Sequence, residues 1–348
     1  MKTPTLSVIM GNYNHAHYLV ESIPAILNQS FRPKELIIID DASTDNSVEI
    51  IERFAKQDSV VRFYKNEKNM GNVATFLKAF ELMTGDYFTT AAADDLVLPG
   101  LFEKSMKMLA KYPHAGLCSA ISRRIDEQGN ELTNSPEPPY ISKTPYYLPP
   151  EKVLEFELKG VVWCMGQTAV WRAEAVKQSG AFSLEFGDFI DGISIPLVTL
   201  NYGACFVPEV LGMVRTLGNS FSDKFRYHPK SYMDLMKKSE KIMLSEAYAS
   251  KFPTSFRDVF RKQSNYQMGA IALYNWENSN NYYYENLLKT FPNPSFMNRV
   301  VICGSKILSK FQYIILKLFL FSRLRKLSWL MIHRVFLRFM KKLEKKQE

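Results

Sequence analysis

The chain has 348 residues, more than the ~100 to 200 of a typical domain, so we expect two units or one large unit with an appendage. With 46% hydrophobic and 23% charged residues, the composition excludes wholesale disorder, a collagen-like chain and a disulfide scaffold. The net charge of +9 would suggest a nucleic-acid binder, but residues 306–348 hold twelve Lys or Arg against two Glu, a net +10, and the first 305 residues sum to −1.

The four cysteines are scattered, with no CxxC spacing, which argues against a zinc site and a disulfide framework. Lys2 leads directly into a strand-like run, without the apolar stretch and cleavage site of a signal peptide. We therefore expect a chain that stays in the cytosol, in a reducing compartment.

The first 125 residues alternate between short apolar runs and segments with helical spacing. The runs predict strands at Leu6–Met10, Glu35–Asp40, Val60–Tyr64 and Asp86–Ala91. The first predicted helix ends near Gln29, and the second begins after the caps at Ser43–Asp45. Two more helices are predicted over Val73–Met83 and Pro99–Lys111. Strands alternating with helices of this length predict an α/β fold, with a mainly parallel sheet covered by helices on both faces.

The rest of the chain is less regular. Residues 134–150 contain six prolines and predict a crossing loop, while Val161–Trp171 predicts a strand and Phe206–Pro208 a short extended piece. From Tyr232 the pattern is largely helical. We expect an α/β domain over 1–228, a helical extension over 229–305 and a basic amphipathic tail over 306–348.

Polar residues follow three of the predicted strands. Gly11-Asn12-Tyr13-Asn14 comes after the first strand, Asp40-Asp41 ends the second, and Asp94-Asp95 lies just past the fourth. Ligands of such sheets bind outside the carboxyl ends of the strands, so these segments predict one common crevice.

No glycine-rich phosphate loop occurs in the sequence. A diphosphate would then be neutralised by a divalent cation such as Mn²⁺ or Mg²⁺, which is commonly held by one or two carboxylates together with water and phosphate oxygens. Asp94-Asp95 could supply these ligands. The alternative is an aspartate pair that only caps the helix that follows it.

Several segments together resemble the inverting family 2 glycosyltransferases of the GT-A fold, in order and in spacing. They are Ser7–Met10, Tyr13-Asn14, Ile38–Asp45, Asn69–Gly71, Thr84–Tyr87 and Ala93–Pro99. The resemblance covers residues 5–222. It implies a GT-A domain that binds a nucleotide diphosphate sugar, with Gly11 in the nucleotide-sugar site, Asp94 near the ribose and Asp95 at a divalent metal.

Two further residues carry the nucleotide prediction. A carboxylate at Asp41 can accept the imide N–H of uracil or thymine, and Tyr13 offers a face on which the base can stack. The expected donor is therefore a uridine or thymidine diphosphate sugar. The alternatives are an ordinary strand-to-helix turn around Asp41 and plain packing for Tyr13.

Inverting transfer needs one general base to take the acceptor hydroxyl proton. In the family this carboxylate precedes a helix that leads to an extended segment ending in Pro-Glu. Counting back from Tyr202–Glu209, the matching position is Asp191, with Asp188 as the neighbouring candidate. The residue before the base is usually Glu in the family, and here it is Ile190. An aspartate that merely caps the helix is the remaining alternative.

Three departures from the family pattern concern the metal and the sequence around it. Ala92 stands where a third acidic residue is often found, Phe76-Leu77 replaces a frequent Arg-Asn, and Leu217 replaces a histidine that can reach the metal. The diphosphate itself could then complete a weak metal site, or Arg215 could take over part of the charge. A degenerate nucleotide-sugar binder also fits these departures.

Aromatic residues lie where the family's acceptor side forms, namely Trp163, Trp171, Tyr146 and Tyr147. Sugars stack on such faces, but we interpret most of these residues as core.

The basic tail predicts binding to a membrane surface. The apolar run Phe311–Phe321 is too short to span a bilayer, and Lys306, Lys310 and Lys317 fall on one helical face. Arg334, Arg338, Lys341 and Lys345 form a second cationic stripe. Such helices favour binding in the plane of an anionic membrane, and the lack of a reader motif argues against nucleic acid. The alternative is a solvated face of a terminal helical bundle.

The sequence as a whole thus predicts a metal-assisted, inverting glycosyltransferase that is peripheral on the cytoplasmic face of the cell membrane. Its expected acceptor is a lipid-linked or growing surface glycan, as in bacterial polysaccharide and O-antigen assembly. A sugar nucleotidyltransferase is a second enzyme reading, but Gly11–Asn14 lacks the glycine-rich, basic loop that such an enzyme needs.

Overall fold

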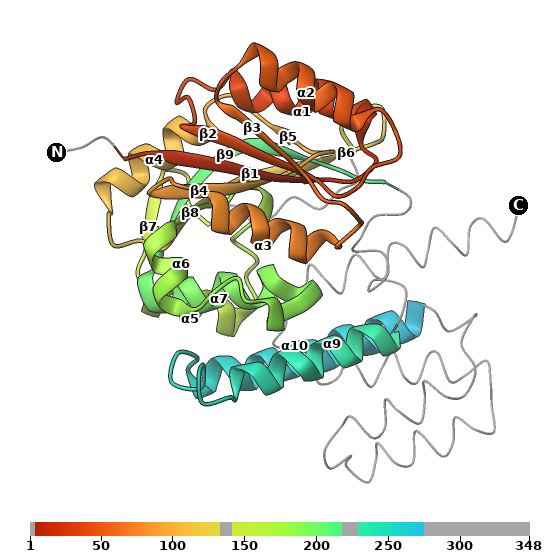
Figure 1. Ribbon diagram of the computed structural model, residues 1–348. Helices are drawn as coiled ribbons and strands as arrows, with labels where there is room; N and C mark the ends of the chain where they lie inside the picture. Colours follow the sequence, from red (N-terminus) through yellow and green to blue (C-terminus); the bar gives the residue numbers. More distant parts are fainter. Residues whose placement is uncertain (1–3, 133–140, 218–228, 275–348) are drawn as a thin grey trace, which may run out of the picture. The chain divides into compact units, whose positions relative to one another are not determined.

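A computed structural model describes residues 4–132, 141–217 and 229–274 of the chain (Figure 1). The chain divides into two compact units. The first comprises Met1–Glu157, Val161–Ser220 and Lys241–Pro253, and the second comprises Leu158–Gly160, Phe221–Glu240 and Thr254–Glu348. The predicted site residues all fall in the first unit.

The first unit is built on one mixed sheet. Its strands are β1 (Leu6–Asn12), β2 (Glu35–Asp40), β3 (Val61–Lys65), β4 (Tyr87–Ala92), β5 (Leu96–Val97), β6 (Leu117–Ile125), β7 (Tyr146–Leu148), β8 (Val170–Arg172) and β9 (Ala204–Arg215). The strand order is β3-β2-β1-β4-β8-β6-β9-β5, and β7 also pairs with β9. The pairs among β3, β2, β1 and β4 are parallel, as is the β6–β9 pair, whereas β8, β5 and β7 run antiparallel to their neighbours.

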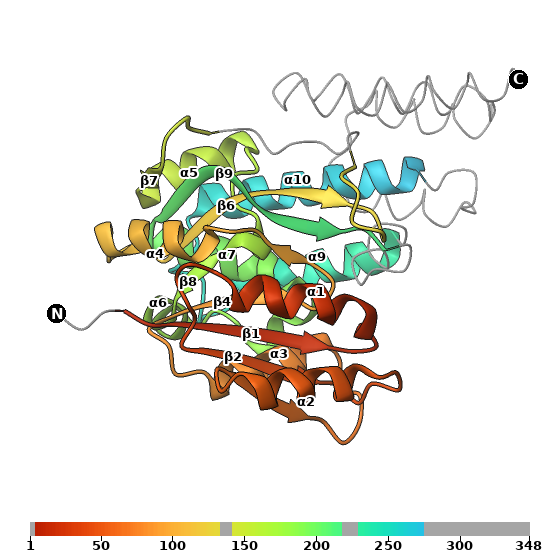
Figure 2. The ribbon, with the colours of Figure 1, turned by 90° about the horizontal axis from the view of Figure 1, so that it is seen from above.

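Helices cover both faces of this sheet (Figures 1 and 2). Those in the first unit are α1 (Ala16–Leu27), α2 (Ser47–Gln57), α3 (Asn72–Leu82), α4 (Leu101–Lys111), α5 (Pro150–Lys159, up to Glu157), α6 (Ala173–Ser179) and α7 (Ile190–Tyr202), with 3-10 turns η1 (Gly166–Thr168) and η2 (Leu184–Phe189). Two longer helices are α9 (Pro229–Met243) and α10 (Thr254–Tyr274). Among the described residues, no helix is long and apolar enough to cross a membrane.

The two central strands explain the strong sequence signal of the first half. Every residue of β2 is buried, as is nearly all of β1, because parallel strands covered on both faces need apolar side chains in both directions. Alternate residues of these strands pack under α1, α2 and α4, and the other face lies against α3. The predicted fold class and the first four strands are confirmed.

The second half differs from the prediction. The strand expected over Val161–Trp171 is wrong for most of its length, because only Val170–Arg172 pairs in the sheet and Gly166–Thr168 forms a 3-10 turn. Phe206–Pro208 belongs to the much longer β9. The expected loop over 134–150 ends early, since β7 and the start of α5 lie within it.

The helical character predicted from Tyr232 is confirmed for α9 and α10. The remainder of the expected extension and the basic tail lie outside the described residues, and the boundaries at 228 and 305 stay predictions. Residues 241–253 group with the first unit rather than with the helices that flank them.

A buried carboxylate organises the amino-terminal edge of the sheet. Glu35 accepts hydrogen bonds from Ser7 Oγ at 2.6 Å and from Thr84 N at 2.6 Å, and it pairs with Arg62. Burial would raise the pKa of Glu35, but these hydrogen bonds outweigh it and lower the pKa below the usual 4.5. The ionised side chain thus joins β1, β2, β3 and the turn before β4.

Replacing this carboxylate should weaken the fold in a pH-dependent way. We expect Glu35→Gln to lower the free energy of unfolding by ~2 kcal/mol near neutral pH, the typical value for hydrogen bonds to a charged group. Because the folded-state pKa is lowered, the difference should be full above the unfolded pKa and vanish as the pH falls through the folded value. Urea unfolding at several pH values measures this, with the exposed Glu52→Gln as control; equal curves for both variants would contradict it.

Candidate active site

The carboxyl ends of β1, β2 and β4 bring most of the predicted donor residues together. In the sheet register Gly11 lies opposite Ile39 on one side and Ala92 on the other, and Asn12 lies opposite Asp40. The segments that follow these strands, with Tyr13, Asp41 and Asp94-Asp95, therefore leave the sheet at one edge. An added Cβ on Gly11 would lie in ordinary van der Waals contact with Thr75 of α3, 3.4 Å away.

The loops after β1 and β2 are joined by side-chain hydrogen bonds. Asp40 Oδ2 accepts from Asn12 Nδ2 at 2.8 Å and from Ser43 Oγ at 2.6 Å. Asn14 Oδ1 accepts from Thr44 N at 2.7 Å, and Asn14 N donates to Ser43 Oγ at 2.9 Å. Asn14 adopts φ 57°, in the left-handed region that Asn tolerates. The two loops therefore form one preorganised rim, a role for Asn12, Asn14 and Asp40 that the sequence analysis missed.

Asp41 holds the turn before α3. Its carboxylate accepts hydrogen bonds from Asn66 Nδ2 at 2.8 Å, Met70 N at 2.8 Å and Gly71 N at 2.9 Å. Burial would raise the pKa of Asp41, but these bonds lower it below the usual value, so the group is ionised at neutral pH. Thr75 is a further hydrogen-bond partner of this carboxylate, which is buried in the described chain. Tyr13, the residue directly before Asn14, is 44% exposed.

The Asp94-Asp95 turn follows β4 and is held by β9. Asp95 Oδ1 accepts from the backbone N of Arg215 at 2.8 Å, and the Asp94 carbonyl accepts from Arg215 Nε at 2.9 Å. Burial, and then the charge of Asp94, raise the pKa of Asp95 to about 7 against the opposing effect of Arg215. Two adjacent, partly desolvated carboxylates of this kind fit a divalent cation, which stabilises their ionised form.

The described residues supply only part of such a cation site. Among the described residues, no group of three or more His, Cys, Asp and Glu side chains is arranged to hold a metal. Ala92 is exposed at the end of β4, and Leu217 is half-buried. The donor set therefore matches a cation that takes one or two protein carboxylates and completes its shell with diphosphate oxygens and water.

Arg215 has a structural role, and its charge also acts on Asp95. Its buried guanidinium donates to the Asp126 and Glu127 carbonyls at 3.2 and 2.9 Å and pairs with Glu21 at 3.0 Å. It also lies over the ring of Tyr18, with Cζ 4.5 Å from the centroid. These partners, together with the Asp94 carbonyl, engage all three guanidinium nitrogens inside the protein.

Asp191 lies in the first turn of α7. No hydrogen bond or ion pair engages its carboxylate within the part of the chain that the structure describes. Its side chain reaches solvent, yet surrounding protein atoms bury the carboxyl group enough to raise its pKa. An added Cβ on Gly166 would lie 3.3 Å from Asp191 Oδ2, which places this carboxylate against η1. Asp188 is exposed in η2.

The aromatic residues considered for the acceptor side divide into core and surface. Trp163 and Trp171 are 2% and 1% exposed, which confirms their interpretation as core, and Trp171 stacks on Phe88. Tyr147 stacks on Tyr112, while Tyr146 is 37% exposed.

The sequence analysis did not single out Glu157 on α5, a carboxyl group with a raised pKa. Its Oε1 accepts from Trp163 Nε1 at 3.4 Å. Burial, opposed by this bond, raises its pKa to about 7.

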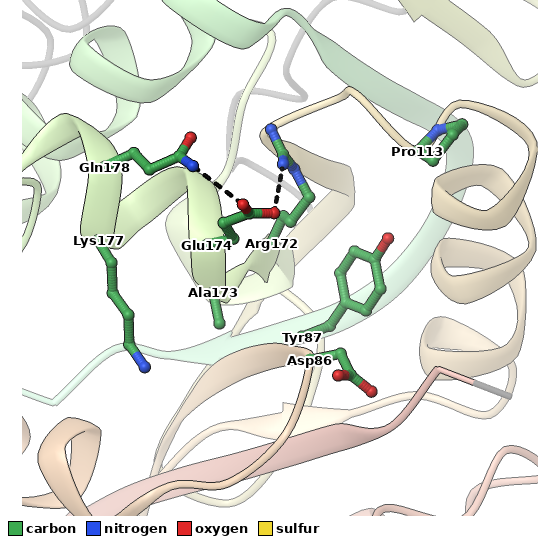
Figure 3. A pocket seen from close by; sticks show the side chains of 8 residues that line it. All are labelled: Asp86, Tyr87, Pro113, Arg172, Ala173, Glu174, Lys177 and Gln178. Atoms are coloured by element: carbon green, nitrogen blue, oxygen red, sulfur yellow. Dashed lines mark hydrogen bonds and ion pairs between the residues drawn. The ribbon is translucent and has the colours of Figure 1, made fainter. Parts of the chain in front are cut away.

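A separate hollow of about 510 Å³ opens at the opposite edge of the sheet (Figure 3). It is lined by Asp86 and Tyr87 at the start of β4 and by Arg172 at the end of β8, with Lys177 on α6. Arg172 bonds Glu174 there and donates to the carbonyls of the turn before β6. Because this hollow lies at the amino end of β4, it is distinct from the predicted donor site.

Comparison with known proteins places the first unit. The model of the family "Glycosyl transferase family 2" matches residues 7–178. EpsE of Bacillus subtilis (strain 168), described as a candidate glycosyltransferase, is 36% identical over 149 residues, which are 41% of this chain and 54% of EpsE. The chain spans about half the length of the curated relatives that it matches.

Two solved structures share the fold. TarS of S. aureus, solved in complex with UDP-GlcNAc, superposes with a TM-score of 0.54 at 14% identity, over 79% of this chain and 73% of that one. The mannosyltransferase PcManGT of Pyrobaculum calidifontis, in complex with GDP-Man and Mn²⁺, gives 0.52 at 16% identity over 91% and 86%. Together with the matched residues, this fold shows that residues 7–178 carry a glycosyl transferase family 2 domain of the GT-A type.

Proposed function

We propose that the protein transfers a sugar from a nucleoside diphosphate sugar, of the uridine or thymidine type, to a hydroxyl of a lipid-linked or growing surface glycan, with inversion. The observation that carries this proposal is one arrangement of carboxylates in the first unit. Asp41 and Asp94-Asp95 follow neighbouring strands, and Asp191, with no bonding partner among the described residues, lies against a turn that bonds the residue after Asp95.

Donor binding is assigned to the carboxyl ends of β1, β2 and β4. The Asp41 carboxylate would accept the imide N–H of the base at an oxygen that it shares with one of its present donors, and the exposed ring of Tyr13 stacks on the base. Gly11 leaves room for the nucleotide, and Asp94 lies near the ribose. TarS with UDP-GlcNAc and PcManGT with GDP-Man support a nucleotide sugar as the donor class.

Asp95 is the proposed ligand of a Mn²⁺ or Mg²⁺ ion. One of its oxygens is occupied by the Arg215 amide at 2.8 Å, which leaves the other for the cation. A bound cation would neutralise the charge that develops on the leaving diphosphate. The Mn²⁺ in PcManGT supports this assignment, and so does the partial donor set described above.

Asp191 is the proposed general base, with Asp188 as the alternative. Its carboxylate takes the proton of the acceptor hydroxyl while the hydroxyl oxygen attacks the anomeric carbon from the face opposite the diphosphate. The bond between that carbon and the diphosphate breaks as the new glycosidic bond forms, so the configuration inverts. A raised pKa brings the base closer to the operating pH, which favours proton transfer.

A degenerate, membrane-associated nucleotide-sugar binder is the second candidate. It is favoured by Ala92, by Leu217 and by the partial set of metal ligands in the described chain. Transfer or hydrolysis of donor sugar by the wild-type protein with added Mn²⁺ separates the two candidates.

The proposed membrane address rests on the sequence of residues 306–348, which carries a net charge of +10. Each cation near an anionic leaflet contributes ~1 kcal/mol of binding free energy. We place the protein on the cytoplasmic face of the membrane, where a lipid-linked acceptor would be presented.

The base assignment predicts a selective loss. Asp191→Asn should lower kcat for transfer by at least ~100-fold, the usual contribution of a positioned base, and leave donor KM within about twofold. Wild-type kcat should fall as the pH drops through the raised pKa of Asp191. Asp188→Asn serves as the matched control and should retain most of the rate; the reverse pattern would move the role to Asp188.

The donor site predicts a metal-linked gain in stability. UDP with Mn²⁺ should raise the Tm of the wild-type protein, because a ligand that binds only the folded state stabilises it. Asp95→Asn should remove most of the Mn²⁺-dependent part of this rise, whereas Asp86→Asn, at the opposite edge of the sheet, should keep it. A Mn²⁺-dependent rise in Tm that is unchanged in Asp95→Asn would contradict the metal assignment. A rise in Tm with GDP but not with UDP would show that the donor carries guanine rather than uracil or thymine.

Binding to the membrane surface is tested in the full-length chain. Exchange of Arg334, Arg338, Lys341 and Lys345 for Gln should reduce partition onto vesicles containing phosphatidylserine by at least ~100-fold, from ~1 kcal/mol for each cation. Vesicles of phosphatidylcholine alone give the baseline. Equal sedimentation of the variant and the wild type would show that these residues do not hold the protein at the surface.

A further inference from the structure

The 3-10 turn Gly166–Thr168 connects two parts of the proposed active site. On one side it lies against Asp191, and on the other it bonds the strand that begins directly after Asp95. The turn residues that make these contacts, Gly166 and Gln167, have no role in the chemistry proposed above.

Gly166 provides the space for the Asp191 carboxylate. A Cβ at this position would lie 3.3 Å from Oδ2 and 3.7 Å from Cγ of Asp191, and the shorter distance is closer than ordinary van der Waals contact. The φ angle of Gly166 is not in the left-handed region, so the backbone conformation alone would accept another residue. An added side chain at residue 166 would therefore meet the Asp191 carboxylate, which would have to shift by a few tenths of an ångström.

Gln167 bonds the same turn to β5, the strand that follows Asp94-Asp95, and to β9. Its Nε2 donates to the Leu96 carbonyl at 3.2 Å and to the Met213 carbonyl at 3.0 Å, and these two residues are partners in the β5–β9 pair. Its Oε1 is buried without a hydrogen-bond partner in the described chain. A Cβ on Gly212 would lie 2.6 Å from that oxygen, so Gly212 is what lets the amide enter.

The turn is itself fixed to β6. Met165 N donates to Ser119 Oγ at 3.0 Å, Thr168 Oγ1 donates to the Ala120 carbonyl at 2.7 Å, and Ala120 N donates to Thr168 Oγ1 at 3.1 Å. A turn bonded to the sheet in this way keeps a constant position. Adjacent residues on it can therefore set the distance between Asp191 and the Asp95 turn.

We propose that Gly166 and Gln167 are positioning residues that fix the Asp191 carboxylate relative to the Asp94-Asp95 turn, and so place the base at the anomeric carbon of the bound donor. This inference rests on the proposed function and adds the part of the chain that determines the geometry of attack. A displacement of about 1 Å at a reacting group can cost ~100-fold in rate. The few tenths of an ångström by which a methyl group at residue 166 would displace Asp191 should therefore cost less, but enough to measure.

The test separates positioning from stability. Gly166→Ala should displace the Asp191 carboxylate and lower kcat by ~5- to 10-fold, with donor KM within about twofold of wild type and the acid limb of kcat against pH shifted. Gln167→Met, which keeps the length of the side chain and removes both hydrogen bonds, should lower kcat by ~10-fold with the same unchanged KM.

Gln29→Met is the matched control for Gln167→Met. Gln29 is also buried, donates Nε2 to two carbonyls, those of Ala25 at 3.1 Å and Leu98 at 3.0 Å, and leaves its Oε1 without a partner among the described residues. It restrains the same segment after Asp95 but belongs to the end of α1 rather than to η1. Its loss should cost comparable stability in urea unfolding and leave kcat within about twofold.

The outcomes distinguish this inference from the proposed function. If the wild type transfers sugar and Asp191→Asn does not, a Gly166→Ala variant with the wild-type kcat overturns the positioning role alone. Equal losses of kcat in Gln167→Met and Gln29→Met overturn it for Gln167. If the wild type transfers no sugar from any donor, the proposed function fails and this inference falls with it.

Discussion

One buried guanidinium joins the parts of the first unit that must meet at the site. Arg215, at the end of β9, reaches Glu21 on α1, the carbonyl of Asp94 and the turn after β6, and its own amide bonds Asp95. A buried charge is tolerated only when it is fully paired, so each of these segments must be in place for the others to be stable. Lysine has no planar fork of donors and could not satisfy them together.

The three carboxylates with proposed roles, Asp41, Asp95 and Asp191, have different surroundings. These differences match the different roles proposed for them. Asp41 is stabilised as an anion by three N–H donors, which suits a permanent acceptor of a base N–H. Asp95 has a raised pKa beside a second aspartate, an arrangement that a cation would relieve. Asp191 has a raised pKa and no bonding partner in the described chain, which suits a group that gains and loses a proton.

The sequence was most informative where local and tertiary requirements agree. The apolar runs of β1 and β2 are buried on both faces, so their composition alone predicts them, and the polar residues that follow lie at the expected edge. The failure at Val161–Trp171 has the opposite cause. Its valines and tryptophans have the composition of a strand, but Trp163 is core and the segment bonds β6 through Ser119 and Thr168 instead of pairing along its length.

The contacts of Gln167, Arg215 and Asn14 could not be predicted, because each joins segments far apart in the sequence and no local pattern marks them. The closeness of Gly166 to Asp191 is of the same kind. What the sequence does predict is the class of site, from carboxylates at the ends of strands; the spacing between those carboxylates depends on the tertiary fold.

The pairing of β9 has a consequence for the behaviour of the chain during folding. Its outer side is covered by β7 near its start and by β5 near its end, and the register with β6 shifts at Pro208-Glu209 between them. A proline cannot donate to a neighbouring strand, and such irregularities interrupt the row of open backbone groups. This edge of the sheet therefore offers no long, flat template to another chain, which protects a twelve-residue strand from edge-to-edge aggregation.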